Sequence, residues 1–436
     1  MEESVRVDII QTSLVTPASA SPQHWLQLSP CDILLRDIAY NRRVLFFPRP
    51  ATASGEDDYA LFINTLQSSL SQVLAVFYPF AGRLAEDEGG RLVVACNDKG
   101  AEFVQARIHG ASFADLQRSN FDMQAYYVHL TRWASYSRLR DEGLAPLLSI
   151  QVTLFSCGNI ALGISHSHVI ADGFSLWHFM SSWAECASGK TLSLYPSHDR
   201  SSLITKNPSH EIEPIVLFKD IAKIDKEDKA NDIKQRAFSF SKKMVDQLKE
   251  KAYNQFGSYE VVCAHIWKKV GKAHDHGCDV EVSFGNVVNM RRRLNPPLPL
   301  GYFGNVLLWG IATTTMDELE EEDLATTASR IRVAVSSCSN SRMRQLINFV
   351  ELQGASALLH KTVASPIRLR VSSSFKFPIM TIDFGWGTPL GVRSVIVEES
   401  GKLVFYPGSS GIGSIDVCLA LPCPLMERLE SDTSFV

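Results

Sequence analysis

One stretch, ISHSHVIADGFSLWHF at 164–179, sets the strongest limit on the fold, because it joins the end of a strand to a helix. Asp172 and Gly173 supply the turn between them, since glycine accepts backbone angles that other residues avoid. Beyond the turn, apolar side chains recur at helical spacing, which predicts an amphipathic helix over 173–188. A strand that passes directly into such a helix indicates a mixed α/β chain, with His168 at the junction.

The strand before this junction forms one half of a predicted hairpin. Strands at 147–155 and 159–169 flank Cys157 and Gly158, a hairpin-type turn. Because strand side chains repeat every two residues, His166 and His168 share one face. Further helices are predicted at 59–74, 242–253, 258–273, 319–338 and 341–359. Further strands are predicted at 5–12, 44–47, 91–96, 104–111, 237–240, 280–290, 380–384, 394–397, 403–406 and 415–421, and a turn at 28–32.

A polar stretch at 191–215 predicts a boundary in the chain, whose 436 residues suffice for two domains. Serine, proline, histidine and asparagine dominate this stretch, and hydrophobic periodicity disappears. Unstructured connections of this length are uncommon inside one compact domain. We therefore predict an N-terminal domain at 1–190, a crossover linker at 191–215 and a C-terminal domain at 216–436.

Composition excludes several classes of function. The net charge is −4, and the Arg291-Arg292-Arg293 triplet is too short to make a basic tract, so nucleic acid is not an expected partner. Nine cysteines include no CxxC pair, which indicates free thiols in a reducing compartment. The sequence has no run of about 18 apolar residues and no apolar leader at its start. We therefore expect a cytoplasmic protein that does not span a membrane.

His168 and Asp172 form an HxxxDG pattern that is the first candidate site. Imidazole titrates near neutral pH, so His168 can take a proton from an alcohol or amine during attack on an acyl group. An isolated HxxxD is more often a core histidine at a strand end, but the strand–turn–helix context favours function here. A metal site is the alternative, with His166, His168 and Asp172 as ligands. No second cluster of histidine or cysteine is visible that would complete its ligand shell.

Two other patterns favour structural interpretations. DFGWG at 383–387 lacks the glycine-rich loop and HRD sequence of a kinase, so we expect a tight turn in which Asp383 accepts backbone or arginine hydrogen bonds. Ser258 lacks the GxSxG elbow of a nucleophilic serine, which makes it an expected helix N-cap.

Several motifs also occur in order along almost the whole chain: HxxxDG at 168–173, YFGN at 302–305 and DFGWG at 383–387. LSPCD, FYPFAGRL, PLLSIQVTLF, SYEVVCAHIW and RRRLNPPLP lie around them. This set resembles the plant BAHD acyl-CoA-dependent acyltransferases. HxxxDG alone is shared with chloramphenicol acetyltransferases and peptide-synthetase condensation domains, whereas HxxxDG with DFGWG at this separation is highly specific. The resemblance implies two similar chloramphenicol-acetyltransferase-like α/β domains, each a mixed sheet with helices, joined by the crossover at 191–215.

The resemblance further implies an enzyme of plant specialised metabolism that uses acyl-CoA as co-substrate and acylates a small-molecule acceptor. It implies a monomer with no permanently bound cofactor and no metal, and a solvent tunnel between the domains. His168 would be the general base, and no covalent acyl-enzyme would form. Asp172 would point away from the substrates and pair with Arg291, which holds the loop of the base.

By the same resemblance, Asp383 is structural, and Ser258 and Tyr259 border the CoA arm. Hydroxycinnamoyl-CoA:shikimate/quinate-type members carry a tryptophan where this chain has Ser372-Ser373-Ser374. His360 or Lys361 lies near the place of the arginine that holds the shikimate carboxylate in those enzymes. The acceptor therefore stays open between hydroxyl and amine, while an aromatic acyl group such as hydroxycinnamoyl is the leading donor. A non-catalytic acyl-CoA-binding or metabolite-binding protein, and a metal hydrolase using His166 and His168, are the alternatives.

Overall fold

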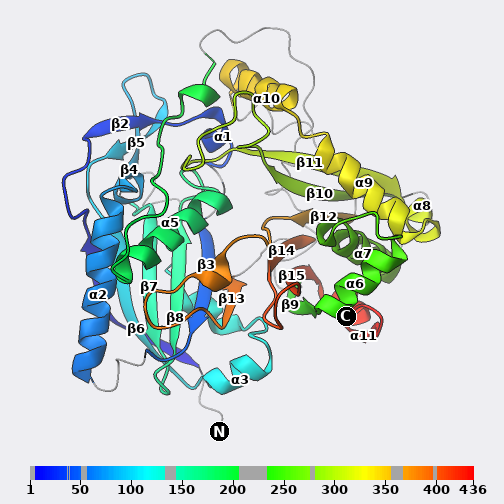
Figure 1. The fold of residues 1–436 in the computed structure, drawn as a ribbon, viewed down its shortest axis with the longest axis horizontal. Coiled ribbons are helices and arrows are strands. Elements are labelled where there is room, and N and C mark those ends of the chain that lie inside the picture. The colour runs from blue at the N-terminus through cyan, green and yellow to red at the C-terminus, as the bar shows by residue number, and fades with distance from the viewer. Residues whose placement is uncertain are drawn as a thin grey trace. The chain divides into compact units, whose positions relative to one another are not determined.

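The computed structural model divides into two compact units (Figure 1). It describes residues 5–36, 38, 40–50, 56–132, 144–205, 233–274, 280–354, 367–395 and 400–436. The first unit comprises Met1–Ile204, Leu298–Val306 and Pro378–Ile396. The second comprises Thr205–Pro297, Leu307–Phe377 and Val397–Val436. Two segments from the second half of the chain thus belong to the first unit, which contiguous domain limits do not anticipate. The acyltransferase domain limits at 190 and 216 stay predictions, and residues 206–215 of the predicted linker lie outside the described residues.

The first unit is organised around a six-stranded mixed sheet. Its strands, in order across the sheet, are β1 (Arg6–Val15), β6 (Ala101–His109), β7 (Leu148–Leu154), β8 (Ile160–His166), β3 (Asn41–Phe47) and β13 (Gly391–Ser394). Only β6 and β7 run parallel among these neighbours; the other pairs are antiparallel. The β7–β8 hairpin confirms the prediction, with Leu154 opposite Ile160. Both strands are almost entirely buried, as expected for central strands covered on both faces.

Helices α2 (Glu56–Leu74) and α5 (Gly173–Ala187) pack together beside this sheet (Figure 1). The indole of Trp183 on α5 donates to the carbonyl oxygen of Leu66 at 3.3 Å and to Ser69 at 3.1 Å on α2. The remaining elements of the unit are a three-stranded antiparallel sheet of β2 (His24–Gln27), β5 (Leu92–Cys96) and β4 (Arg83–Glu86), with the short helices α1 (Pro30–Ile33), η1 (Tyr78–Ala81), α3 (Phe113–Arg118), η2 (Ala125–Leu130), η3 (Ser201–Leu203) and η6 (Ile379–Thr381).

The second unit contains another six-stranded mixed sheet, covered by helices. The strand order is β11 (Leu307–Thr315), β10 (Glu281–Asn289), β12 (Ile367–Val371), β14 (Lys402–Pro407), β15 (Ile415–Pro422) and β9 (Ile233–Phe240). Its helices are α6 (Lys242–Lys251), α7 (Ser258–Ala273), α8 (Met316–Glu321), α9 (Leu324–Ser336), α10 (Asn340–Gln353) and α11 (Cys423–Ser431). Trp267 of α7 packs against Phe284 of β10 at 5.6 Å between ring centroids, inside a core that also contains Phe405. The predicted fold class of two similar α/β domains with mixed sheets is therefore confirmed.

Several local predictions differ from the structure. The predicted strand at 380–384 is wrong, because residues 379–381 form a 3₁₀ turn. The predicted helix at 319–338 is two helices, since Asp323 caps α9 by accepting from the amide of Thr326 at 2.8 Å. Ser258 is the first residue of α7, and Gly257 occupies the N-cap position, so the predicted Ser258 cap is also wrong. The turn predicted at 28–32 overlaps helix α1, which begins at Pro30 and ends at Ile33.

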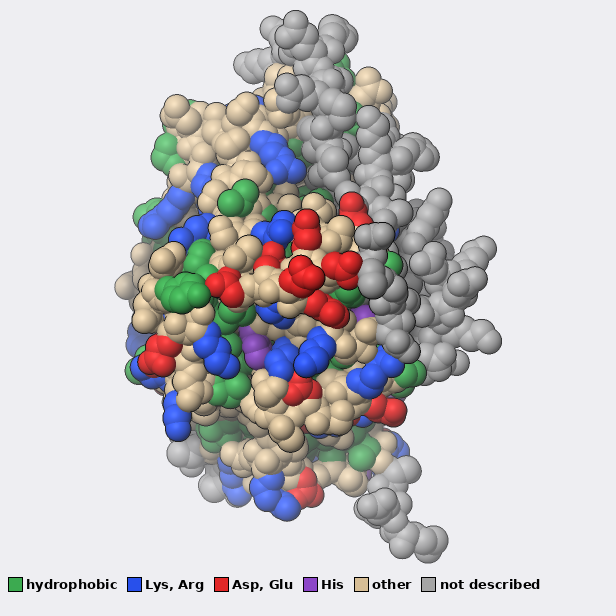
Figure 2. All heavy atoms as spheres, turned by 90° about the vertical axis from the view of Figure 1, so that its right-hand side faces the viewer, with side chains coloured by type: hydrophobic (Ala, Val, Ile, Leu, Met, Phe, Trp, Pro, Cys, Tyr) green, Lys and Arg blue, Asp and Glu red, His purple; other side chains and the backbone are tan. Residues whose placement is uncertain are grey.

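The surface of the second unit carries a concentration of negative charge. Acidic side chains gather on one exposed face (Figure 2). Helix α8 and the two residues after it supply the exposed Glu318, Glu320, Glu321 and Asp323. Arg330 of α9 pairs with Glu318 at 3.1 Å, which places part of this charge in solvated ion pairs. Among the described helices, none combines the length and the apolar character needed to cross a membrane.

Candidate active site

His168 lies two residues beyond the end of β8 and five residues before α5, at the predicted strand–turn–helix junction. Asp172 is the N-cap of α5, and its Oδ1 accepts the backbone N–H of Ser175 at 2.9 Å. An aspartate in this position satisfies an amide that the helix leaves unpaired and interacts favourably with the helix dipole. The junction is therefore fixed by a buried carboxylate at the start of the helix.

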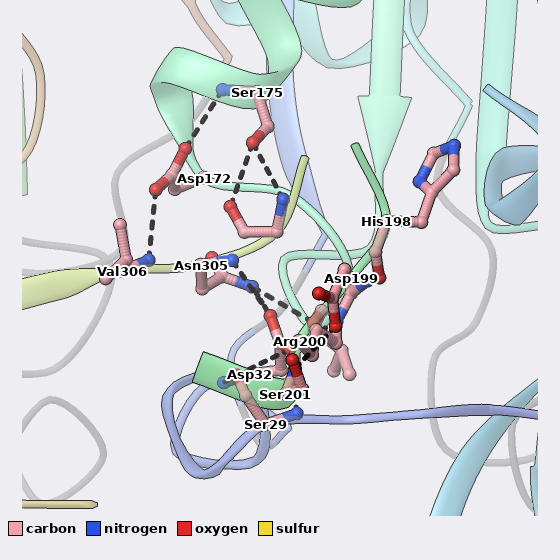
Figure 3. Close-up of polar contacts among 12 residues, drawn as sticks. Ser29, Asp32, Asp172, Ser175, His198, Asp199, Arg200, Ser201, Asn305 and Val306 are labelled. Carbon is pink, nitrogen blue, oxygen red and sulfur yellow. Dashed lines mark hydrogen bonds and ion pairs between the residues drawn. The ribbon is translucent and has the colours of Figure 1, made fainter. Parts of the chain in front are cut away.

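The same helix start also holds the segment 304–306, which contains the end of the YFGN motif (Figure 3). Oδ2 of Asp172 accepts the backbone N–H of Val306 at 3.3 Å. The hydroxyl of Ser175 donates to the carbonyl oxygen of Gly304 at 2.8 Å and accepts the N–H of Gly304 at 3.0 Å. Two segments separated by 129 to 134 residues in the sequence are thus joined by buried hydrogen bonds.

Asn305 connects this segment to the main chain of the candidate base. Its Nδ2 donates to the carbonyl oxygen of His168 at 2.9 Å and to that of Val169 at 3.0 Å. It also donates to Oδ1 of Asp32 at 2.8 Å, and the backbone N–H of Asn305 reaches the same oxygen at 2.9 Å. The side chain of Asn305 is fully buried. The YFGN motif therefore supplies a bridge between His168 and α1.

Asp32 and Arg200 form a buried ion pair that the sequence did not reveal (Figure 3). Nε of Arg200 donates to Oδ2 of Asp32 at 2.8 Å, and both side chains are at most 2% exposed. Asp32 also completes a capping box with Ser29, whose hydroxyl donates to Oδ2 at 2.7 Å. Burial lowers the pKa of Arg200, but the Asp32 carboxylate and neighbouring Tyr302 outweigh it, and the net direction is upward. The local SPCD spacing could have predicted the capping box, whereas nothing local links residues 32 and 200.

The two histidines of the junction have different environments. His166 is fully buried, its Nε2 lies 3.2 Å from the carbonyl oxygen of Ala171, and burial lowers its pKa to about 3. His168 is only partly buried, and burial also lowers its pKa below the ordinary value, while its own backbone carbonyl and Asp172 act in the opposite direction. His168 is therefore neutral near pH 7, and a neutral imidazole can accept a proton.

The metal alternative has no complete ligand set in the described part of the chain. The rings of His166 and His168 are 6.2 Å apart between centroids. No group of three or more histidine, cysteine, aspartate or glutamate side chains suited to a metal ion occurs among the described residues.

Asp383 lies in the first unit, in a turn that follows η6. Its Oδ1 accepts the backbone N–H groups of Gly385 at 2.8 Å and Gly387 at 2.9 Å, which lowers the pKa of the carboxyl group. The backbone carbonyl of Asp383 accepts the hydroxyl of Ser188, just beyond the end of α5, at 2.9 Å. Trp386 packs on Phe62 of α2 with 4.6 Å between centroids. The predicted backbone hydrogen bonds to Asp383 are present, and none of these contacts reaches His168.

The remaining predicted residues belong to the second unit. Tyr259, next to Ser258 in the first turn of α7, donates its hydroxyl to Oδ1 of Asn286 at 2.8 Å, and burial raises its pKa. Arg291 is buried, and both its backbone N–H and its Nη1 reach Oδ1 of Asn289, at 3.0 and 3.3 Å. The CoA-side assignment of Ser258 and Tyr259 and the pairing of Arg291 with Asp172 stay predictions.

The stretch that departs from the shikimate/quinate-type enzymes falls at the end of β12. Ser372 donates its hydroxyl to the carbonyl oxygen of Leu403 at 3.2 Å. His360 and Lys361, named as candidates for the place of the carboxylate-binding arginine, lie outside the described residues.

The chain thus combines two α/β units with mixed sheets and a histidine at a strand–helix junction close to a buried aspartate. The transferase family model matches residues 5–436. A hydroxycinnamoyltransferase of Narcissus pseudonarcissus is 30% identical over 97% of this chain and 98% of its own length. Anthranilate N-benzoyltransferase protein 1 of Dianthus caryophyllus is 30% identical over 95% of this chain and 96% of its own.

Solved structures agree on the fold. Vinorine synthase matches with a TM-score of 0.76 at 24% identity, over 97% of this chain and 96% of its own. The F. graminearum protein TRI101, solved with coenzyme A and deoxynivalenol, matches with a TM-score of 0.80 at 17% identity, over 94% and 98%. The chain belongs to this transferase family, the BAHD acyl-CoA-dependent acyltransferases.

Proposed function

We propose that the protein transfers an aromatic acyl group, such as hydroxycinnamoyl, from acyl-CoA to a hydroxyl or amine of a small-molecule acceptor. The observation that carries this proposal is His168: a neutral, partly exposed imidazole whose main chain is held by Asn305. The aromatic donor is supported by the names of the relatives, which include hydroxycinnamoyl and benzoyl transferases. Coenzyme A as the carrier agrees with the molecules present in the TRI101 structures.

The proposed reaction needs one base. His168 takes the proton of the acceptor O–H or N–H while the acceptor atom bonds to the thioester carbonyl carbon, and the carbonyl oxygen becomes an oxyanion. The carbonyl then re-forms, the C–S bond breaks, and the CoA thiolate takes the proton from the imidazolium. The products are an ester or amide and free CoA, with no acyl group left on the protein. Holding both reactants beside one base supplies the proximity that such a transfer needs.

The other predicted roles belong to this proposal. Asp172, with Arg291, would support the loop of the base, Asp383 would be structural, and Ser258 and Tyr259 would border the CoA. We also propose a cytoplasmic monomer. The described cysteines are free thiols, which supports a reducing compartment.

Replacing the base tests the proposal most directly. His168→Ala should lower kcat by about 10²–10⁴-fold with p-coumaroyl-CoA and a responsive acceptor, because that is the usual contribution of a general base. His166→Asn is the comparison variant, since the buried His166 is not assigned a chemical role. Turnover near that of the unmodified enzyme after His168→Ala would remove His168 as base.

A non-catalytic binding protein on this fold is the competing function. Release of free CoA thiol from a panel of acyl-CoAs, measured with each of several hydroxyl and amine acceptors, separates the two. Acceptor-dependent thiol release supports catalysis, and binding without release across the panel supports sequestration.

A further inference from the structure

Asp32 and Arg200 are two buried charges with no role in the reaction proposed above. Burying an ion pair is costly, and apolar residues of similar volume often give equal or greater stability. A fully desolvated pair that is joined to the candidate base through hydrogen bonds therefore calls for an explanation beyond stability. The pair connects to His168 through one side chain, that of Asn305 (Figure 3).

The carboxylate of Asp32 fixes which way the amide of Asn305 faces. Oδ1 of Asp32 accepts both the backbone N–H and the Nδ2 of Asn305, at 2.9 and 2.8 Å. Reversing the amide would bring its carbonyl oxygen against this carboxylate and against two backbone carbonyl oxygens, and none of these groups can donate. The negative charge therefore keeps Nδ2 directed at the carbonyl groups of His168 and Val169.

Arg200 in turn fixes the carboxylate. Its Nε holds Oδ2 at 2.8 Å, and its Nη1 donates to the carbonyl oxygen of His198 at 3.1 Å, so the guanidinium is anchored to the chain beyond α5. Ser29 donates its backbone N–H and its hydroxyl to the same Oδ2, at 3.0 and 2.7 Å. The Asp32 carboxylate is thus held by Ser29 and Arg200 at Oδ2 and by Asn305 at Oδ1, and its free rotation is removed.

Asn305 holds the backbone carbonyl oxygen of the residue that carries the candidate base. Burial lowers the pKa of the His168 imidazole, and the residue's own backbone carbonyl and the Asn305 side chain partly oppose that shift. Which ring nitrogen carries the proton depends on the polar groups that face the ring, and the other nitrogen is then the base. The orientation of this peptide group therefore governs how the imidazole is presented.

We propose that Asp32 and Arg200 are positioning residues for acyl transfer, which orient Asn305 and through it the main chain and ring of His168. This inference deepens the proposed function and rests on His168 as the base. Neither residue touches a reacting group, so the predicted defect is in kcat and not in acyl-CoA binding.

The test uses the full chain with neutral replacements. Asp32→Asn and the double variant Asp32→Asn/Arg200→Gln both remove the carboxylate, and the double variant leaves no unpaired buried charge. We expect kcat to fall about 10-fold to 100-fold, because displacing a reacting group by about 1 Å can cost 10²-fold. The KM for acyl-CoA should stay within about twofold, because a lost positioning contact lowers kcat without removing ground-state binding.

Asp87 and Arg91 provide the matched control. They form a 2.8 Å ion pair at the turn between β4 and β5, with Arg91 68% exposed. Asp87→Asn/Arg91→Gln makes the same chemical change and should leave kcat unaltered.

A second readout follows the ring itself, in enzyme labelled with ¹⁵N-histidine. The ring nitrogens of His168, assigned by their loss in His168→Gln, should report one tautomer in the unmodified enzyme and an averaged mixture in the double variant. The acid limb of kcat/KM should also move to lower pH in Asn305→Ala, since Asn305 raises the pKa of His168. A purely structural pair would lower the melting temperature and leave these signals unchanged at lower temperature.

The outcomes separate the two proposals. Unaltered kcat and ring signals in a folded double variant overturn the positioning role while His168→Ala remains inactive. Failure of both neutral variants to fold assigns the pair to stability alone and overturns the positioning role as well. Full turnover of His168→Ala overturns the base and the positioning role together.

Discussion

Asp172 and Asp32 are two fully buried carboxylates of the same unit that accept adjacent backbone amides, those of Val306 and Asn305. Asp172 sits four residues from His168 and caps the helix that follows it. Asp32 lies far away in sequence, carries a guanidinium partner and reaches His168 only through Asn305. A short motif can thus reveal one support of a candidate base, while a second support that acts through another side chain stays hidden.

The largest expected difference concerns stability. Asp32→Ala leaves Arg200 buried without its carboxylate, and breaking one partner of a buried pair typically costs about 3–5 kcal/mol. Chemical denaturation of the purified variant, followed by tryptophan fluorescence, measures this loss. A loss below about 1 kcal/mol, the range of an exposed pair, would contradict the burial argument.

A smaller loss is expected for Asp172→Ala. It removes a helix N-cap, worth about 0.5–2 kcal/mol, and leaves the Val306 amide unsatisfied at about 1–3 kcal/mol. Asp172→Asn should cost less, because asparagine caps helices as well as aspartate does. If Asp172→Asn instead costs as much as Asp32→Ala, the comparison breaks, and the predicted cationic partner Arg291 gains support.

Acid should destabilise the first unit, because burial lowers the pKa of two of its histidines, His166 and His198. The pKa of His166 is lowered from 6.5 to about 3, so the unfolded chain binds more protons between these values and stability falls as pH drops below 6.5. Between pH 7 and pH 5.5 the expected loss is about 1 kcal/mol for this histidine. His198, whose carbonyl group accepts from Arg200, has its pKa lowered to about 4 by burial and adds in the same direction.

Denaturation at the two pH values tests this assignment with single substitutions. His166→Asn and His198→Asn should each reduce the pH dependence. If the free energy of unfolding depends on pH as strongly in both variants as in the unmodified protein, other groups cause the acid sensitivity.

After Asp32 and Asp172, the smallest effect is expected at a third aspartate of the first unit, Asp383. Asp383 accepts two backbone hydrogen bonds in a partly exposed turn, and Asp383→Asn weakens these bonds, each worth about 1 kcal/mol. A melting-temperature scan and kcat should show a slight loss of stability with turnover retained. A kcat defect as large as that of His168→Ala would assign Asp383 to the chemistry.

The sequence predicted elements whose signal is local. The β7–β8 hairpin and α5 follow from apolar patterning and one turn, and the junction that places His168 follows from them. The strand predicted at 380–384 failed because a short apolar run also suits a 3₁₀ turn that buries one side chain, here Ile379 in the turn at 379–381. The Asp32–Arg200 pair escaped prediction because 168 residues separate its members in the sequence. A contact between two such distant residues produces no hydrophobic periodicity or local motif that could reveal it.

The first unit borrows its edge strand β13 and the Asn305 segment from late parts of the chain. When only residues 1–204 have left the ribosome, strand β13, which pairs with β3, has not yet been made. Asn305, whose side-chain amide donates to the carbonyl oxygen of His168, is missing as well. Synthesis must proceed to residue 394 before all six strands of this sheet are present. The first unit therefore cannot complete its fold until the later half of the chain has been made. A fragment that ends at the apparent linker would have a sheet without its edge strand β13.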